Sequence, residues 1–380
     1  MQRLHVRLAT RRHQYEIRVG RKTLREIGHH TRECVSALAR RVAVISNRKV
    51  FDLYGARAVE SLRANDFQVS TWLMADGERF KSLRTAERAL LFLSQTGLER
   101  TDAVLALGGG VVGDMAGFAA ASYLRGIAFI QLPTTLIAQI DSSVGGKTGV
   151  NLPQGKNLIG AFHQPSAVII DTETLETLPP RELVAGWCES IKQGAVGSRK
   201  LFEQTTNFLT KLDANPKRLL STTLEELISA HCAFKASIVA GDEREAPERS
   251  DRRSRRILNF GHTVGHALEA ITHYRRFRHG EAVGYGMLVA GEISKSLGLL
   301  ATSELELLRD AVRLSGSLPK ANDLNVSAII NAVSRDKKSI GGRIQWVLLE
   351  RIGRALIVDG KEIHPQVLRS SLRASLKAAN

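Results

Sequence analysis

The stretch AVLALGGGVVGD, residues 103–114, indicates how the first half of the chain folds. Its first five residues are small and apolar, as in a short strand that is buried on both faces of a sheet. The glycines at 108–110 allow a sharp turn, and the small residues near 115–121 are expected to continue as a helix. A strand that leads through a tight turn into a helix is the repeating unit of parallel sheets.

Short apolar strands and helical segments alternate on both sides of this stretch. We expect a starting hairpin formed by residues 6–8 and 15–19. The remaining strands are predicted at 42–46, 67–74 and 127–132, and the helical segments between them at 59–62 and 86–93. This alternation predicts a parallel sheet that is covered by helices on both faces.

The sequence pattern changes after the proline pair at 179–180. Proline is tolerated in the first turn of a helix, because its missing N–H would have no partner there. Helical periodicity then dominates over residues 181–196, 199–212, 223–240, 261–272, 281–297 and 303–315. We therefore predict an α/β domain at 1–178, an all-α domain at 179–380, and a ligand-binding cleft between them.

The composition excludes several classes of protein. The chain has 380 residues, of which 43% are hydrophobic, which suits two domains with a sizeable core and excludes a disordered chain. Three widely spaced cysteines argue against a disulfide framework and fit a reducing cytosol. No apolar run reaches 18 residues, and the N-terminal stretch lacks the apolar core of a signal peptide, so we expect a cytoplasmic protein that does not insert into a membrane.

Lysine and arginine outnumber aspartate and glutamate by 54 to 38, which gives a net charge of +16. Such an excess fits either an anionic partner or a solvated basic surface without a specific role. The dense basic run at 249–256 contains no aromatic residue that could stack on bases, so we do not expect nucleic-acid binding. A small phosphorylated acid is the anionic partner that fits better.

The glycine run is a candidate phosphate site. Gly108, Gly110 and Gly113 have the GxGxxG spacing, which lets a backbone approach a pyrophosphate at a helix N-terminus. The usual acidic residue about 20 positions later is missing, so an unusual dinucleotide site, a phosphate site and a plain tight turn all fit. The loop 76–81 and the threonines at 134–135 follow strands, where ligands of parallel sheets bind, although the loop could also be an ordinary turn.

Three histidines and one acid form a candidate metal site. His262 and His266 stand four residues apart, so both project from one face of a helix, and His279 follows. Glu189 lies among apolar neighbours in a predicted helix, with Lys192 on the same side. These residues suit a catalytic zinc-type ion with open positions. The alternatives are a surface histidine pair and a core acid in a plain ion pair.

Five motifs occur in order along nearly the whole chain. They are GGGVVGD at 108–114, LPTTLIAQIDSSVGGKTGVN at 132–151, GKNLIGAFHQP at 155–165, LNFGHTVGHALE at 258–269 and RHGEAV at 278–283. Together they resemble the motifs of 3-dehydroquinate synthases. The resemblance implies a Rossmann-like NAD-binding domain followed by a helical domain, with the active site in the cleft. It also implies tightly held NAD, a divalent metal ion (zinc or cobalt) and a homodimer.

The resemblance implies a reaction as well. The family converts 3-deoxy-D-arabino-heptulosonate 7-phosphate into 3-dehydroquinate and phosphate, the second step of the shikimate pathway. NAD oxidises a hydroxyl transiently, phosphate is eliminated, the hydride returns, and the ring closes by an intramolecular aldol reaction. The metal would polarise the reacting oxygen, and basic side chains would bind the phosphate and the carboxylate of the substrate.

The same resemblance implies roles for individual residues of this chain. The metal ligands would be Glu189, His262 and His279. The NAD contacts would be Asp76, Gly77, Glu78, Arg79, Phe80, Lys81, Gly110, Val111, Val112, Gly113, Asp114, Thr134, Thr135, Lys147, Lys156, Thr174, Leu175, Glu176 and Thr177. The substrate-side residues would be Asp141, Asn157, Lys192, Lys235, Glu245, Arg255, Asn259, His266 and a late lysine, Lys337 or Lys338. Arg125 resembles the arginine that reaches the site of a neighbouring subunit.

The chain departs from the family pattern in two regions. Cys188 and Ser190 flank Glu189 where alanine and valine are common, and Gln193 stands where an aromatic residue or histidine is frequent. The segment 246–254 is longer than its counterpart in the family. We expect it to form a surface loop that leaves the chemistry intact, although it makes the choice between Arg255 and its neighbour, residue 256, open.

Two relatives of the same fold are alternatives. A sugar phosphate cyclase of secondary metabolism would use the same cofactors on another substrate, but DSSVGGK at 141–147 keeps the form found in dehydroquinate synthases. A metal-dependent polyol dehydrogenase would instead release NADH in every turnover.

Overall fold

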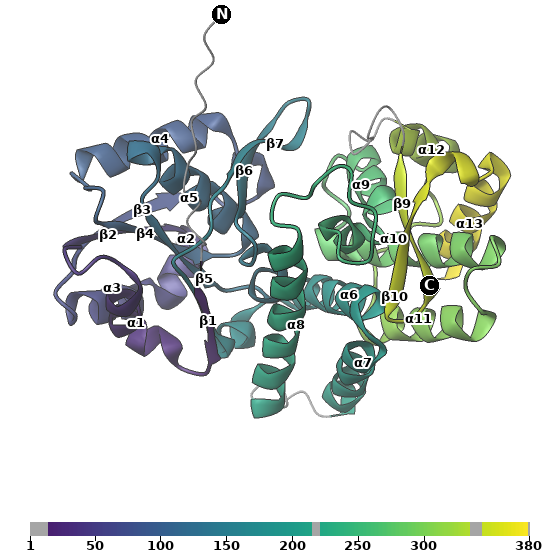
Figure 1. Cartoon of the computed structure of the whole chain (residues 1–380), viewed down its shortest axis with the longest axis horizontal. Coiled ribbons are helices and arrows are strands. Elements are labelled where there is room, and N and C mark those ends of the chain that lie inside the picture. The colour runs from purple at the N-terminus through teal and green to yellow at the C-terminus, as the bar shows by residue number, and fades with distance from the viewer. Residues whose placement is uncertain (1–13, 215–220, 335–343, 379–380) are drawn as a thin grey trace, which may run out of the picture.

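A computed structural model describes residues 14–214, 221–334 and 344–378. A six-stranded sheet forms the N-terminal half, and helices dominate the C-terminal half (Figure 1). The predicted combination of a parallel α/β domain with a largely helical region is therefore confirmed. The exact division at residue 178 stays a prediction.

The sheet has the strand order β1-β8-β5-β4-β2-β3, and its paired strands all run parallel. Its second, third, fourth and fifth strands along the chain lie where they were predicted. β1 and β8 were not predicted to lie in this sheet, where they pair with each other. Residues 6–8 of the expected hairpin lie outside the described residues. The strands are β1 (Glu16–Gly20), β2 (Arg41–Asn47), β3 (Gln68–Met74), β4 (Ala103–Gly108), β5 (Ala128–Pro133) and β8 (Ala167–Asp171).

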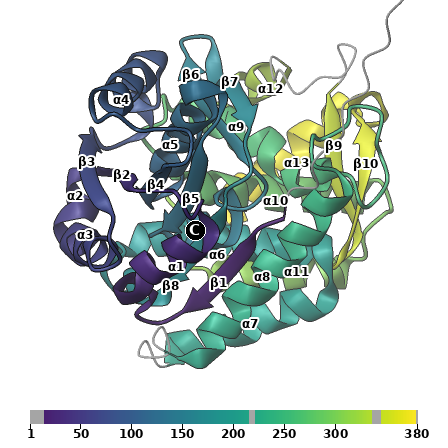
Figure 2. The ribbon, with the colours of Figure 1, turned by 60° about the vertical axis from the view of Figure 1, so that its left-hand side comes forward.

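Helices cover both faces of the sheet, because successive side chains of a strand point to opposite faces. In β2, Ala43 and Ile45 pack with α4 (Leu83–Gln95) and α5 (Gly110–Ser122). Val42 and Val44 alternate with them and pack with α1 (Ile27–Cys34) and α3 (Ala56–Arg63). Figure 2 shows these helix pairs on opposite sides of the strands. Every residue of β4 is buried, as expected for a strand that is covered on both faces.

Two features after β5 were not predicted from the sequence. The first is η5 (Ala138–Ser142), a π-helix, a wide helical turn that occurs often at functional sites. The second is the antiparallel hairpin of β6 (Lys147–Leu152) and β7 (Gly155–Phe162). Both features carry several of the polar residues that the motifs single out.

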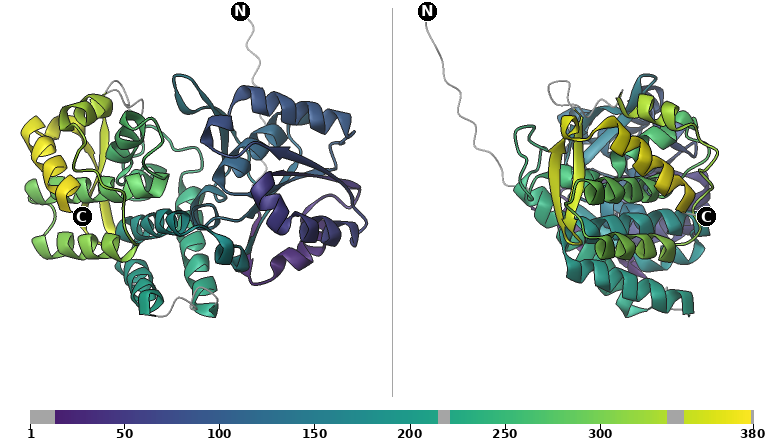
Figure 3. Two further views of the ribbon diagram at one scale, coloured as in Figure 1. Left: turned by 180° about the vertical axis from the view of Figure 1, so that it is seen from behind. Right: turned by 90° about the vertical axis from the view of Figure 1, so that its right-hand side faces the viewer.

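All six helices predicted in the second half are present. They are α6 (Pro180–Gly197), α7 (Arg199–Ala214), α8 (Thr222–Gly241), α9 (His262–Ile271), α10 (His279–Ser296) and α11 (Thr302–Leu314). The expectation of an all-α domain is wrong, because β9 (Gln345–Arg351) and β10 (Arg354–Asp359) form an antiparallel hairpin that packs beside the helices (Figure 3). Gly353 has a φ of 81°, so glycine suits the turn of this hairpin. Two further helices, α12 (Val326–Ser334) and α13 (Pro365–Ala378), were also not predicted.

One apolar core joins the two halves of the molecule. Ile140 of η5 and Ile170 of β8 belong to the same buried cluster as Trp187 and Ile191 of α6. The helix that carries Glu189 thus shares a buried cluster with β8 and contacts the segment after β5, where Gly186 lies against Leu136. Among the described residues, no helix is both long and apolar enough to span a membrane.

The close approach of α9 and α10 generates a first prediction. A Cβ atom added to Gly286 in α10 would lie 1.8 Å from the carbonyl oxygen of Gly261, directly before α9. We predict that Gly286→Ala lowers the free energy of unfolding by about 1–3 kcal/mol, because overpacking forces the helices apart. Denaturant unfolding measures the change. Gly241→Ala is the control, because its added Cβ would meet no atom closer than 3.9 Å; equal stability of the two variants would contradict the prediction.

Candidate active site

The carboxyl ends of the parallel strands bring three segments together, as is usual for ligand sites in such sheets. α5 begins at Gly110, directly after β4. A Cβ on Gly110 would lie 2.8 Å from Oγ of Ser142, and a Cβ on Gly109 would lie 3.0 Å from Cγ2 of Thr135. The glycines therefore allow the turn after β4, the segment after β5 and the π-helix η5 to meet. The hydroxyl of Thr134 is buried there without a hydrogen bond from the described residues.

Lys81 connects the loop after β3 to α5 and β7. Its side chain is only 4% exposed, it pairs with Asp114, and its Nζ donates to Oδ1 of Asn157 at 2.5 Å. Burial raises the pKa of Asp114, and Lys81 only partly offsets this effect. Three residues from distant parts of the sequence thus form one polar group at the sheet edge, in which Lys81 is buried, Asp114 is partly buried and Asn157 is exposed.

Asp141, in η5, lies among lysines. Nζ of Lys235 is 2.8 Å from Oδ1 of Asp141 and also donates to the main-chain carbonyl of that residue. Burial alone would raise the pKa of Asp141, but Lys235 and Lys192 outweigh it and lower the pKa. Burial lowers the pKa of Lys235, and Asp141 offsets this only in part. Asp141 is therefore an ionised carboxylate at neutral pH, held by cations from the helical half.

Glu245 lies between the hairpin and the helical half. Lys147 of β6 pairs with its carboxylate, and Nδ2 of Asn259 donates to its Oε1 at 3.2 Å. The contact with Lys147 joins segments that are far apart in the sequence, whereas Asn259 follows Glu245 by fourteen positions. The structure thus brings together a predicted NAD contact and two predicted substrate-side residues.

Three imidazoles and one carboxylate converge between α6, α9 and α10. The ring centroid of His262 lies 5.3 Å from that of His266 and 5.1 Å from that of His279. Ligand atoms of all three histidines lie within 4.8 Å of one another. Nε2 of His279 is 3.8 Å from Oε1 of Glu189. The alternative of a surface histidine pair is wrong, because His262 is buried.

Glu189 also forms a buried ion pair. Its Oε2 is 2.6 Å from Nζ of Lys192, and both side chains are 1% exposed. Burial alone would lower the pKa of Lys192, but the carboxylates of Glu189 and Asp141 raise it. Neither carboxylate oxygen of Glu189 accepts a well-directed hydrogen bond from the described residues. This donor set fits a divalent cation, which binds imidazole nitrogen and carboxylate oxygen and leaves positions open for a substrate.

One residue of the cluster was missed in the sequence. Glu269 is 3% exposed, its Oε1 lies 3.0 Å from Nζ of Lys156, and its Oε2 lies 3.3 Å from Nδ1 of His279. Burial opposes ionisation, but His279 and Lys156 lower the pKa of Glu269 to about 2. Spacing could have revealed this residue, since it follows His262 by seven positions and His266 by three and so lies on the same helix face.

The structure separates the roles of Arg255 and Arg256. Arg255 is 3% exposed, and its Nη1 donates to the carbonyl oxygens of Gly145 at 2.9 Å and Glu243 at 2.8 Å. Arg256 instead donates to the carbonyl of Arg249, within the longer segment 246–254. Only the first of the two arginines therefore reaches a segment next to Asp141.

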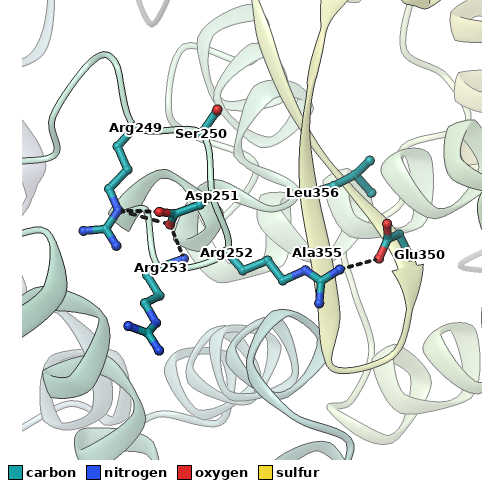
Figure 4. A pocket seen from close by; sticks show the side chains of 8 residues that line it. All are labelled: Arg249, Ser250, Asp251, Arg252, Arg253, Glu350, Ala355 and Leu356. Carbon is teal, nitrogen blue, oxygen red and sulfur yellow. Dashed lines mark hydrogen bonds and ion pairs between the residues drawn. The ribbon is translucent and has the colours of Figure 1, made fainter.

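The longer segment forms a loop over the β9–β10 hairpin (Figure 4). Within it, Nε of Arg249 lies 3.1 Å from the carboxylate of Asp251, and Nη2 of Arg252 donates to Glu350 at 3.2 Å. A hollow of about 600 Å³ beside this loop is lined by none of the predicted site residues. The loop is thus tied to the β9–β10 hairpin through Arg252 and Glu350.

Several of the remaining predicted residues make contacts outside the histidine cluster. Gln139 donates to the hydroxyl of Thr174 at 3.0 Å, and Tyr54 contacts Thr177. Asp76 accepts a hydrogen bond of 3.3 Å from Asn47. Arg125 is exposed in a short turn. The late lysines at 337 and 338 lie outside the described residues.

Sequence comparison shows that two family profiles match the chain. The profile described as 3-dehydroquinate synthase N-terminal matches residues 71–185, and the profile described as 3-dehydroquinate synthase C-terminal matches residues 186–339. A 3-dehydroquinate synthase from a Picosynechococcus species is 43% identical over 352 residues, which cover 91% of this chain and 92% of that protein.

Two solved structures are similar over nearly their whole length. The 2-epi-5-epi-valiolone synthase of Streptomyces hygroscopicus subsp. jinggangensis, with NAD+ and Zn2+ bound, has a TM-score of 0.86 and 26% identity, covering 98% of this chain and 99% of that one. A 2-deoxy-scyllo-inosose synthase complexed with carbaglucose-6-phosphate, NAD+ and Co2+ has a TM-score of 0.79 and 25% identity, covering 94% and 96%.

Asp242 binds the backbone N–H of Arg255, and this contact generates a prediction about how stability depends on pH. Its carboxylate accepts hydrogen bonds of 2.8 Å from the backbone N–H groups of Ala246 and Arg255. Burial alone would raise the pKa of Asp242, but these N–H groups lower it. A lowered pKa stabilises the fold above the ordinary pKa of aspartate, and this contribution is lost as the pH falls through the native value.

We therefore expect Asp242→Asn to lower the free energy of unfolding at pH 7, and we expect the difference from wild type to shrink between pH 5 and pH 3. Urea unfolding across this range measures it. Asp310→Asn, in an exposed pair with Arg313, is the control and should change little at any pH. A deficit of Asp242→Asn that stays constant down to pH 3 would contradict the assigned cause.

Proposed function

The chain belongs to the 3-dehydroquinate synthase family, and on that premise we propose how its residues carry out the family reaction. It is a carbon–oxygen lyase that converts 3-deoxy-D-arabino-heptulosonate 7-phosphate into 3-dehydroquinate and phosphate, with NAD and a divalent metal ion as cofactors. The observation that carries the proposal is the convergence of Glu189, His262 and His279 beside the buried cluster of Asp141, Lys192 and Lys235.

The proposed metal ligands are Glu189, His262 and His279. Their support is the mutual approach of the imidazoles and the lack of well-directed hydrogen bonds to the buried carboxylate. His266 lies in the same cluster and is proposed to face the substrate. When bound, the metal ion would polarise the oxygen of the reacting carbon, and NAD would take up and return the hydride at that carbon.

The side chains around this point would bind and orient the substrate. Lys235 and Lys192 flank Asp141 and offer N–H donors to the anionic groups of a phosphorylated sugar acid. Arg255 and Asn259 approach the same region from η8 (Arg255–Asn259). Because Lys192, Lys235 and Arg255 are buried and already oriented by their partners, binding would require little further ordering of these side chains.

The proposed NAD site follows the carboxyl edge of the sheet. The N-terminus of α5 offers backbone N–H groups to a pyrophosphate, and the glycines before it allow a close approach. The unpartnered buried hydroxyl of Thr134 supports a polar ligand at this edge. Loop 76–81, Thr135, Lys147, Lys156 and the segment 174–177 are proposed to complete this site.

We also propose that the enzyme works as a homodimer in the cytoplasm. The support for the dimer is the family resemblance of Arg125, which stands exposed in the turn η4 (Tyr123–Arg125) rather than in the cluster of its own chain. The support for the location is the sparse and unpaired cysteine content.

A cyclase acting on another sugar phosphate shares this fold, but the sequence identities favour the synthase. The similar cyclase structures are 25–26% identical, whereas the synthase from Picosynechococcus is 43% identical.

A polyol dehydrogenase differs in its products. Phosphate release from 3-deoxy-D-arabino-heptulosonate 7-phosphate without net formation of NADH would support the synthase, and accumulation of NADH would support the dehydrogenase.

The metal assignment predicts the effect of one substitution. We expect Glu189→Gln to reduce phosphate release by about a hundredfold or more, because several kcal/mol of charge stabilisation are lost. A chelator should abolish the wild-type activity, and added Zn²⁺ or Co²⁺ should restore it. The bound metal per chain, measured by elemental analysis, should fall in the variant.

The matched control is Glu292→Gln. Glu292 is also a buried, ion-paired carboxylate of the helical half, but it lies thirteen positions after His279 on α10, about 20 Å along the helix. This control should retain activity and metal. Wild-type metal content and turnover in Glu189→Gln would exclude Glu189 as a ligand.

The dimer proposal predicts complementation between two inactive variants. Arg125→Ala and Glu189→Ala should each be inactive alone. Mixed dimers would contain one intact site if Arg125 reaches the partner, so reassorted samples should recover about a quarter of wild-type activity. Absence of recovery after verified subunit exchange would show that Arg125 does not act across the interface.

A further inference from the structure

The π-helix η5 carries Asp141, and side chains from two helices hold the end of this turn. Nε2 of Gln193, on α6, donates to the carbonyl oxygen of Ile140 at 2.9 Å. Lys235, on α8, donates to the carbonyl oxygen of Asp141. The wide turn therefore obtains hydrogen bonds from neighbouring helices, and these bonds fix the backbone from which the Asp141 side chain projects.

Gln193 also touches the carboxylate itself. The same Nε2 lies 3.3 Å from Oδ1 of Asp141, and the Gln193 side chain is fully buried. One amide group thus holds both the backbone and the carboxylate of the turn. These two hydrogen bonds require one orientation of the Gln193 amide. A flipped amide would place Oε1 against the carbonyl and the carboxylate, which can only accept hydrogen bonds.

His231 fixes this orientation of the Gln193 amide. It is 1% exposed, and its Nδ1 lies 3.0 Å from Oε1 of Gln193. Because Oε1 can only accept, Nδ1 must carry the hydrogen. Burial lowers the pKa of His231 to about 3, so the ring is neutral and Nε2 is an acceptor. Nε2 lies 3.1 Å from the hydroxyl of Thr205, and that hydroxyl also donates to the carbonyl oxygen of Leu201 at 2.8 Å, so the two acceptors share its single hydrogen.

The spacing of these residues places them directly behind the proposed site. Gln193 follows Glu189 by four positions on α6, and His231 precedes Lys235 by four positions on α8. Residues four apart lie on one helix face. A continuous buried chain thus runs from Thr205 through His231 and Gln193 to Asp141.

We propose that His231 is a positioning residue of this enzyme: it orients the amide of Gln193, which in turn holds Asp141 and the turn that carries it. The inference rests on the proposed function, because it assigns to Asp141 a place beside the substrate. Gln193 is one of the positions where the sequence departs from its family pattern. The contacts of Gln193 with Asp141 and His231 provide a structural reason for a glutamine at this position.

The test compares three variants. His231→Phe keeps the bulk of the ring but removes the donor, Gln193→Leu removes the amide, and the third variant combines both changes. Each single change should lower kcat by about tenfold, the effect of losing one hydrogen bond to a charged group, while KM changes much less. The double variant should be no worse than the poorer single variant, because the two residues act through one chain.

Ser294→Ala is the matched control. Ser294 is buried on α10 and bonds to Ala290 and Leu349, so its loss removes buried hydrogen bonds at a distance from Asp141. It should lower thermal stability without changing kcat. A His231→Phe variant that is folded and has wild-type kcat, or losses that add in the double variant, would overturn the proposal.

A second measurement needs no substrate. Nitrogen NMR of histidine-labelled wild-type protein, with the His231 signals identified from the variant, should show a neutral ring protonated at Nδ1 from pH 6 to 8. Protonation at Nε2 alone would overturn the inference, whatever the activity. If the wild type itself fails to release phosphate, the proposed function fails, and the NMR result still decides the orientation of the amide.

Discussion

The ion pair of Glu189 and Lys192 is the interaction on which the site depends, because it places two charges where water cannot reach them. Both side chains are 1% exposed, so either charge alone would be strongly destabilised by burial. Their spacing of three residues on α6 lets each charge stabilise the other within one helix. The same constraint governs Lys81 with Asp114 and Lys235 with Asp141, which are also partly or fully buried.

These pairs also explain how two dissimilar halves form one site. Lys235 on α8 pairs with Asp141 in η5, and Lys156 on β7 pairs with Glu269 on α9. Each of these pairs joins the sheet-based half to the helical half. The apolar core continues across the same junction, from Ile140 to Ile191, so the residues that form the ion pairs lie next to packed apolar side chains. The ion pairs fix the relative positions of the polar groups of the two halves, which hydrophobic packing alone would allow to shift.

The sequence predicted those parts of the molecule that local patterns determine. Buried strands such as 103–107 and helices such as 181–196 follow from periodicity, and the motifs placed the histidines and Glu189 in one cluster. The π-helix was missed because its width depends on hydrogen bonds from Gln193 and Lys235, which lie far away in the sequence. The β9–β10 hairpin was missed because short apolar runs resemble helix segments when the neighbouring pattern is helical.

The lysines of the site do not account for the basic character of the chain. Lys81, Lys147, Lys156, Lys192 and Lys235 each face one carboxylate, so these pairs add nothing to the net charge of +16. The excess of positive charge comes from other residues of the chain, and a net positive charge of this kind favours anions over long range. Inside the proposed site, an anionic substrate would have to exchange hydrogen bonds with the carboxylates that pair with the lysines. An anion that matches only some of these donors would leave buried charges unpaired, and this cost is a physical source of selectivity.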